Sequence, residues 1–202
     1  ALARPAFRGS NASFMLGSMP RPIRASIDLA ALRHNFALAR RAAPAAKAFA
    51  VLKANAYGHG VMRCAAALGA ADGFALLEID AAVRLREAGF QQPILLLEGV
   101  FDTTELAVAA EQRLACTLHH FDQAAMLREL PAHSRIDVFV KLNTGMNRLG
   151  IAPRDLGSML ERLEAIPCVG SITLMTHFAC ADDERGIAEQ FRRFSEATRS
   201  RT

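Results

Sequence analysis

Apolar and polar residues are arranged in two patterns along this chain, one typical of strands and one typical of helices, and the two patterns alternate. Short apolar runs, typical of buried strands, are each followed by a segment whose apolar residues recur every three or four positions, as on one face of a helix. The predicted strands cover residues 47–54, 73–77, 93–97, 114–118, 135–142 and 171–176. The predicted helices cover residues 61–68, 80–88, 103–112, 122–130, 153–166 and 184–199. One more helix is predicted after the N-cap residue Asp28.

Six strand–helix units in strict alternation predict a parallel sheet covered by helices. Two α/β architectures have this pattern, an open doubly wound sheet and a closed (β/α)8 barrel. The first strand is not followed by G-x-G-x-x-G, because Gly58-His59-Gly60 continues into Val61, so the dinucleotide-binding fingerprint is absent. We therefore predict a TIM-type (β/α)8 barrel truncated after about six units. A full barrel takes about 250 residues, which places units seven and eight beyond Thr202.

Composition limits the class of protein. Residues 1–24 contain four arginines and no acidic residue, and the other 20 basic residues balance the 20 acidic ones. Residues 25–202 therefore have no net charge, which argues against a surface that binds nucleic acid. We expect residues 1–22 to be a disordered leader or tag-like segment and residues 23–202 to form the partial barrel. No apolar run approaches the roughly 18 residues that span a bilayer. The scattered cysteines predict reduced, buried thiols and a cytoplasmic protein.

Polar side chains with reactive groups stand where three predicted strands end. Lys53 lies in AVLKANAYGHG, Lys141 and Arg148 lie in VKLNTGMNRLG, and His177 lies in LMTHFACAD. A single lysine at a strand end is usually a surface charge. The carboxyl ends of barrel strands, however, share one rim, which is where barrel enzymes place their active sites. A partly desolvated lysine amine there can lose its proton and form a Schiff base. This chemistry points to pyridoxal 5'-phosphate (PLP) or to an aldolase-type carbonyl substrate.

The three segments also resemble a known family. AVLKANAYGHG is similar to the PLP-lysine motif of the alanine racemases, and VKLNTGMNRLG and MTHFACAD resemble two further blocks of that family in the same order. The similarity runs from about Ile23 to the last residues. It implies an N-terminal (β/α)8 barrel, a C-terminal β-domain that this chain lacks, and a head-to-tail homodimer. It also implies interconversion of L- and D-alanine in the cytoplasm, which supplies D-alanine for cell-wall peptidoglycan.

The resemblance assigns a role to five residues. Lys53 would hold PLP as the internal aldimine and act as the base on the α-proton of D-alanine. Tyr57 would contact the cofactor phosphate, Arg148 the phenolate oxygen of the ring, and His177 would lie beside the pyridine ring. Lys141 resembles the carbamylated lysine of the family, whose negative charge could orient the guanidinium of Arg148.

Other polar residues of these segments are given lesser roles. Asn143 stands where many family members have aspartate, which leaves the lysine and the arginine in place. His59 is interpreted as a turn or packing residue. His119 and His120 have no partner at metal-ligand spacing, so no metal site is predicted.

Three functional hypotheses remain open from the sequence. The first is the N-terminal portion of an alanine racemase. The second is a related PLP-barrel enzyme, such as a racemase for another amino acid or a decarboxylase. The third is a single-barrel PLP-binding or carrier protein without turnover. In the family the second base is a tyrosine on the C-terminal domain of the other subunit, and Tyr57, the only tyrosine of this chain, cannot be that residue. We therefore expect residues 1–202 alone not to racemise alanine. Because the first and sixth strands would have no partner and the phosphate-binding loops after strands seven and eight would be missing, we also expect this chain to aggregate and to bind PLP weakly.

Overall fold

The computed structural model describes residues 25–199, which form a parallel sheet of six strands in chain order from β1 to β6. The predicted leader, residues 1–22, lies outside the described residues. The strands are β1 (Phe49–Val51), β2 (Gly73–Leu76), β3 (Ile94–Leu96), β4 (Ala115–Leu118), β5 (Ile136–Leu142) and β6 (Val169–Thr176). The α-helices are α1 (Leu29–Ala42), α2 (Lys53–Tyr57), α3 (Val61–Ala67), α4 (Ile79–Glu87), α5 (Thr103–Glu111), α6 (Phe121–Met126), α7 (Leu156–Glu164) and α8 (Ala188–Thr198). Two 3₁₀ turns are η1 (Leu127–Glu129) and η2 (Pro153–Asp155).

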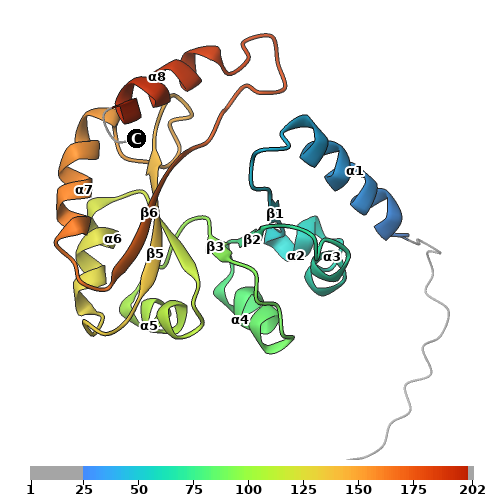
Figure 1. Cartoon of the computed structure of the whole chain (residues 1–202), viewed down its shortest axis with the longest axis horizontal. Coiled ribbons are helices and arrows are strands. Elements are labelled where there is room, and N and C mark those ends of the chain that lie inside the picture. The colour runs from blue at the N-terminus through green and yellow to red at the C-terminus, as the bar shows by residue number, and fades with distance from the viewer. Residues whose placement is uncertain (1–24, 200–202) are drawn as a thin grey trace, which may run out of the picture.

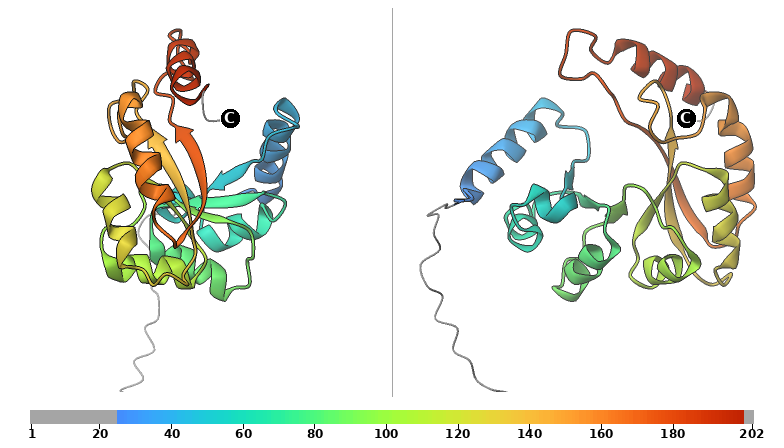
Figure 2. Two further views of the ribbon diagram at one scale, coloured as in Figure 1. Left: turned by 60° about the vertical axis from the view of Figure 1, so that its left-hand side comes forward. Right: turned by 180° about the vertical axis from the view of Figure 1, so that it is seen from behind.

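The sheet curves, and its helices cover the convex side. Figures 1 and 2 show α3 to α7 along this outer side, with α1 and α8 on either side of the opening between β1 and β6. Strands β1 and β6 are the two edges of the sheet. The prediction of an α/β fold with a parallel sheet is confirmed, and the arrangement is that of a truncated TIM-type barrel.

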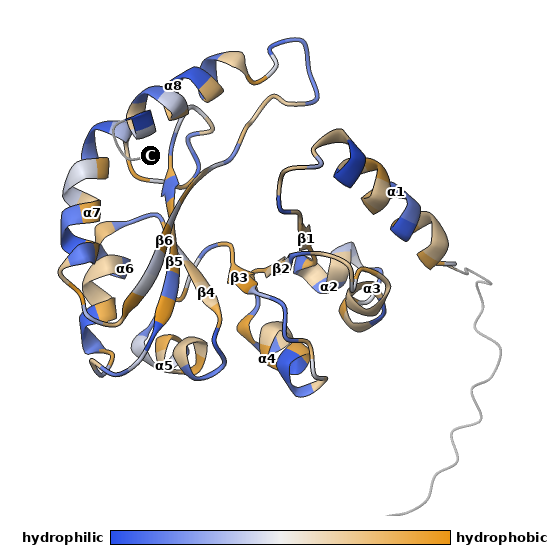
Figure 3. Ribbon diagram, in the orientation of Figure 1, coloured by the Kyte–Doolittle hydropathy of each residue, from blue (hydrophilic) through white to orange (hydrophobic). Residues whose placement is uncertain are grey.

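Alternate strand residues serve the two sides of the sheet. One set packs against the helices in the main apolar core, for example Phe74 and Leu76 of β2 and Val138 and Val140 of β5. The residues between them, such as Ala75, belong to a smaller apolar group on the concave side. Figure 3 shows β3 and β4 mostly in apolar colours, whereas helices such as α4 and α8 carry both apolar and polar residues. The concave side is less covered, and 42% of Val51 is exposed.

Most predicted elements are found where the sequence placed them. Asp28 caps α1 as predicted, because its carboxylate accepts hydrogen bonds from the amides of Ala30 and Ala31 at 2.8 and 3.0 Å. The four cysteines are buried and unpaired, as expected. The predicted helix 122–130 is divided between α6 and η1, and the predicted helix 153–166 between η2 and α7.

Two predicted boundaries are wrong. The first strand ends at Val51 and not at residue 54, since the backbone turns into α2 directly after Leu52. The last helix begins at Ala188 and not at residue 184. There the chain makes a turn, in which Arg185 pairs with Asp183 and Gly186 has a φ of +59°. Local hydrogen bonding and a left-handed glycine thus replace the first predicted helical turn.

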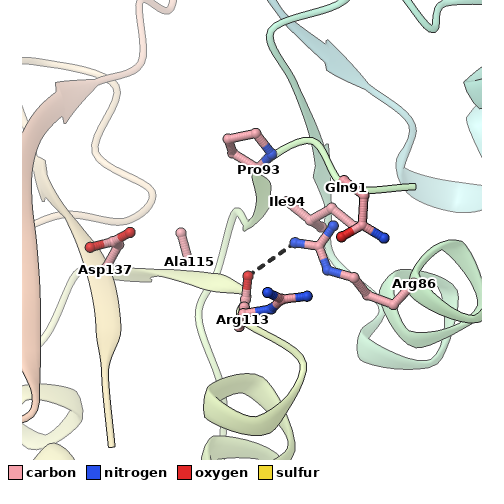
Figure 4. Close-up of a pocket in the computed structure, with 7 residues that line it drawn as sticks. All are labelled: Arg86, Gln91, Pro93, Ile94, Arg113, Ala115 and Asp137. Carbon is pink, nitrogen blue, oxygen red and sulfur yellow. Dashed lines mark hydrogen bonds between the residues drawn. The ribbon is translucent and has the colours of Figure 1, made fainter. Parts of the chain in front are cut away.

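At the amino ends of the strands, Arg86 of α4 joins the two connections that lead into β3 and β4. Its guanidinium donates to the carbonyl oxygens of Gln112 at 2.9 Å, Phe90 and Gln92 at 2.8 Å, and Arg113 at 3.0 Å. Figure 4 shows Arg86 beside Arg113, at a hollow of about 210 Å³. Burial, followed by the charge of Arg113, lowers the pKa of Arg86. A planar guanidinium with five N–H donors can bind four carbonyl oxygens at once, whereas the ammonium group of a lysine, with three donors, cannot.

Replacing Arg86 with alanine should lower the free energy of unfolding by about 2–4 kcal/mol, because four carbonyl groups lose a charged donor. Arg86→Lys should recover less than half of this loss. The matched control is Arg84→Ala, which removes an exposed arginine from the same helix and should change stability by less than about 0.5 kcal/mol. Urea unfolding followed by circular dichroism measures all three variants. Equal stability of Arg86→Ala and Arg84→Ala would refute the role of Arg86.

Candidate active site

A cavity of about 310 Å³ opens at the carboxyl ends of the strands, opposite the Arg86 connections. Its polar lining consists of Lys53, Tyr57, Glu98, Lys141, Arg148 and His177, together with Thr176. Its walls are apolar and consist of Val51 of β1, Leu77 and Leu97 directly after β2 and β3, and Met175 of β6. The structure therefore brings all five sequence-predicted site residues to one cavity.

Lys53 and Tyr57 are joined by a single turn of left-handed helix. Ala54, Asn55 and Ala56 have φ between 52° and 54° and ψ between 46° and 50°, and Tyr57 has a φ of 53°. Residues other than glycine adopt this conformation at a cost of roughly 1–2 kcal/mol each. The turn brings residues four positions apart to the same side, and Lys53 Nζ lies 6.0 Å from the centroid of the Tyr57 ring.

Side chains on both sides of the turn hold this strained backbone. The amide of Ala54 donates to Glu78 Oε1 at 3.0 Å, and Asn55 Oδ1 accepts from the amide of Val61 at 2.9 Å. His59 Nδ1 lies 2.9 Å from the carbonyl oxygen of Ala56 and 3.2 Å from that of Tyr57. The conformation is therefore a property of the whole segment and of its neighbour Glu78.

Positive charge collects in the cavity with little to oppose it. Lys141 of β5 points into the concave side and is only 5% exposed. Among the described residues, no ion pair includes Lys53, Lys141 or Arg148, and Glu98 is the acidic residue in the lining. Burial, followed by the charge of Arg148, lowers the pKa of Lys141. Three cations beside one carboxylate make this cavity suited to an anion.

Arg148 and His177 are in direct contact. Arg148 Nη2 lies 3.2 Å from His177 Nδ1. A guanidinium group can only donate, so Nδ1 accepts and the proton of the neutral ring resides on Nε2. Burial lowers the pKa of His177, and the charges of Arg148, Lys141 and Lys53 add to this effect. The imidazole is therefore held neutral, with its Nε2–H group available as a donor.

The loop after β5 carries Arg148, and Asn143 organises it. Asn143 Oδ1 accepts from the amides of Gly145 at 3.1 Å and Asn147 at 3.0 Å. Asn147 has a left-handed φ of 58°. A Cβ atom at Gly150 would lie 2.7 Å from the amide nitrogen of Asn143, so a side chain at this position would clash with the start of the loop. The amide at position 143 thus shapes the turn that presents the guanidinium.

Sequence reasoning missed two acidic residues of this region, Glu98 at the cavity and Glu78 beside the turn. Both stand directly after predicted strands, 93–97 and 73–77. The strand-end rule that selected Lys53 and His177 applies equally to these two positions. The left-handed conformation was also missed, and Asn55, a residue type enriched in that region of backbone space, was its only local indication.

Comparison with known proteins identifies the family of this chain. The protein-family model described as "Alanine racemase, N-terminal domain" matches residues 27–202. The chain belongs to the alanine racemase family. It is 54% identical over 186 residues to the alanine racemase of Nitrosospira multiformis, which covers 91% of this chain and 52% of that protein.

Solved structures of racemases share the fold. The biosynthetic alanine racemase of Pseudomonas aeruginosa superposes with a TM-score of 0.80 at 40% identity, over 84% of this chain and 48% of the other. A histidine racemase of Leuconostoc mesenteroides superposes with a TM-score of 0.74 at 27% identity, over 83% of this chain and 46% of the other. The chain thus spans about half the length of the racemases that it matches. Within residues 25–199, no helix is long and apolar enough to cross a membrane.

Stability should fall as the pH falls from 7.5 to 5.5, partly because of His177. The unfolded imidazole binds its proton near pH 6.5. The folded ring has a lowered pKa, so between the two values the unfolded state binds more protons and acid favours unfolding. His177→Gln should flatten this part of the profile of melting temperature against pH. The control His133→Gln, at an exposed histidine, should leave the slope unchanged. An unchanged slope in His177→Gln would contradict the assignment.

Proposed function

We propose that this chain forms the PLP-binding barrel portion of an alanine racemase, which interconverts L- and D-alanine. The observation that carries the proposal is the amine of Lys53 at the mouth of a cation-rich cavity, in a chain that belongs to the alanine racemase family. We further propose a cytoplasmic homodimer that supplies D-alanine for peptidoglycan.

The residues of the cavity fit PLP. The cofactor carries an aldehyde, a phenolate oxygen and a phosphate, and it supplies an electron sink that stabilises the substrate when its α-proton leaves. The amine of Lys53 would hold the aldehyde carbon, with loss of one water. Arg148 would donate to the phenolate oxygen, Tyr57 would donate its hydroxyl to the phosphate, and His177 would lie at the ring. The scarcity of carboxylates in the lining favours an anionic group of this kind.

Lys53 would also move the substrate proton. With the substrate held in the cavity, the amine of Lys53 would be placed to take the α-proton of D-alanine from its own face. Inversion requires a second acid on the opposite face. Tyr57 lies beside Lys53 and therefore serves the same face. We propose that the partner subunit of the homodimer provides the second group.

Proton exchange at the α-carbon tests this function. In D2O with added PLP, the 202-residue chain should exchange the α-proton of D-alanine about 100-fold faster than PLP alone, since a positioned general base contributes a factor of this order. Exchange of L-alanine should stay close to the rate with PLP alone. Proton NMR follows both isomers.

The variant Lys53→Arg keeps the positive charge and cannot act as a base at neutral pH, so it should exchange no faster than PLP alone. The matched control is Lys47→Arg, at an exposed lysine just before β1, which should behave as the wild type. Undiminished exchange in Lys53→Arg would refute the role of Lys53. D- and L-histidine serve as alternative substrates, because a histidine racemase shares the fold, and preferred exchange of histidine would change the substrate assignment.

We also propose that Lys141 is carbamylated. Its burial and the nearby charge of Arg148 lower its pKa, which increases the fraction of neutral amine. A neutral amine adds to carbon dioxide, forms one N–C bond and loses one proton, so the side chain becomes an anion. This change would replace repulsion between Lys141 and Arg148 with attraction, and it would fix the guanidinium that would donate to the phenolate oxygen.

Carbon-13 NMR in labelled bicarbonate should reveal one carbamate signal near neutral pH. Lys141→Gln should abolish that signal, and Lys47→Gln should keep it. Acidification should remove it, because protonation of the amine and of the carbamate both favour release of carbon dioxide. A spectrum without a carbamate, or a signal that persists in Lys141→Gln, would overturn the proposal.

A further inference from the structure

His59 stands behind the left-handed turn and outside the catalytic cavity. It lines an apolar hollow between α1 and the turn, which Tyr57 also borders, whereas Tyr57 additionally lines the cavity that contains Lys53. Any effect of His59 on the cavity must therefore pass through the backbone of the turn.

The contacts of His59 reach the end of the turn that carries Tyr57. Glu78 binds the amide of Ala54, and Asn55 binds the amide of Val61. His59 Nδ1 instead faces two carbonyl oxygens, those of Ala56 at 2.9 Å and Tyr57 at 3.2 Å. Carbonyl oxygens only accept, so Nδ1 carries a proton.

The two glycines that flank His59 make this contact possible. Gly58 has a φ of +84° and Gly60 a φ of +94°, values that residues other than glycine rarely adopt. Together they reverse the chain so that the ring of His59 folds back over the two carbonyl groups that precede it. The amide of His59 also donates to the carbonyl oxygen of Ala56 at 3.0 Å. Backbone and ring of one residue thus close the same end of the turn.

We propose that His59 is a positioning residue that closes the left-handed turn and thereby holds the hydroxyl of Tyr57 where the phosphate of the cofactor binds. This inference rests on the proposed function, because it takes the ligand of Tyr57 to be that phosphate. His59 itself does not line the cavity that contains Lys53.

The composition of the chain supplies a direct readout. Tyr57 is the only tyrosine and there is no tryptophan, so fluorescence excited in the tyrosine band, at wavelengths too long for phenylalanine, reports on Tyr57 alone. The test uses His59→Ala, which removes the donor, and His59→Asn, whose Nδ2 is bonded to the same γ carbon as the lost Nδ1. The matched control is His133→Ala, at an exposed histidine whose side chain takes part in no hydrogen bond among residues 25–199.

Without cofactor, the fluorescence anisotropy of Tyr57 should fall in His59→Ala because the ring gains freedom. His59→Asn and His133→Ala should keep the value of the wild type. Unchanged anisotropy in His59→Ala would overturn the proposal, and so would a loss in His59→Asn as large as in His59→Ala. Because His59→Asn retains the donor, it keeps the test decisive even if His59→Ala fails to fold.

With cofactor, titrations compare PLP with pyridoxal, which lacks the phosphate. His59→Ala should weaken PLP binding about three- to tenfold, the effect of one lost hydrogen bond, and should leave pyridoxal binding unchanged. An equal loss for both ligands would indicate a general structural defect and would contradict a role at the phosphate. If the wild type binds both ligands equally, the proposed phosphate contact of Tyr57 is wrong, while the anisotropy difference still decides whether His59 holds the turn.

Discussion

Parallel pairing of the strands in chain order is the constraint on which the site depends. Each strand pairs in parallel with the next one along the chain, so the carboxyl ends of all six strands lie on the same rim of the curved sheet. Residues separated by more than a hundred positions, such as Lys53 and His177, are brought to one cavity in this way. The helices on the convex side bury the apolar face of the strands, and the concave side remains for the chemistry.

The second determinant of the site is its positive charge. Lys141 is buried in the concave wall, and Lys53 and Arg148 face the same space without an acidic partner at ion-pair distance in the described part of the chain. Such an arrangement costs free energy in the absence of a ligand. An anionic cofactor, and a carbamate on Lys141, would both reverse that cost. The contact between Arg148 and a neutral His177 follows the same principle, because a neutral imidazole can accept from a guanidinium without adding charge.

The sequence predicts the order of the elements and the cavity residues well, because both follow from strand periodicity. A strand-end residue is recognisable wherever an apolar run stops, as at Lys141 or His177. The left-handed turn was not predictable in this way. Ala54, Ala56 and Tyr57 have no intrinsic preference for positive φ, and their conformation depends on contacts with Glu78, which is 24 positions from Ala54, and with His59. The late start of α8 likewise depends on a local pairing of Asp183 with Arg185, which a periodic pattern does not encode.

We propose that the left-handed turn presents Lys53, and no other lysine, to a carbonyl cofactor. The chain has three lysines, Lys47, Lys53 and Lys141, so the claim has a direct chemical test. PLP is added to the chain, the product is reduced with borohydride, and the modified peptide is identified by mass spectrometry. We predict a pyridoxyl group on Lys53, at a PLP concentration where Lys47 remains unmodified. Preferential modification of Lys47 or Lys141 would contradict it.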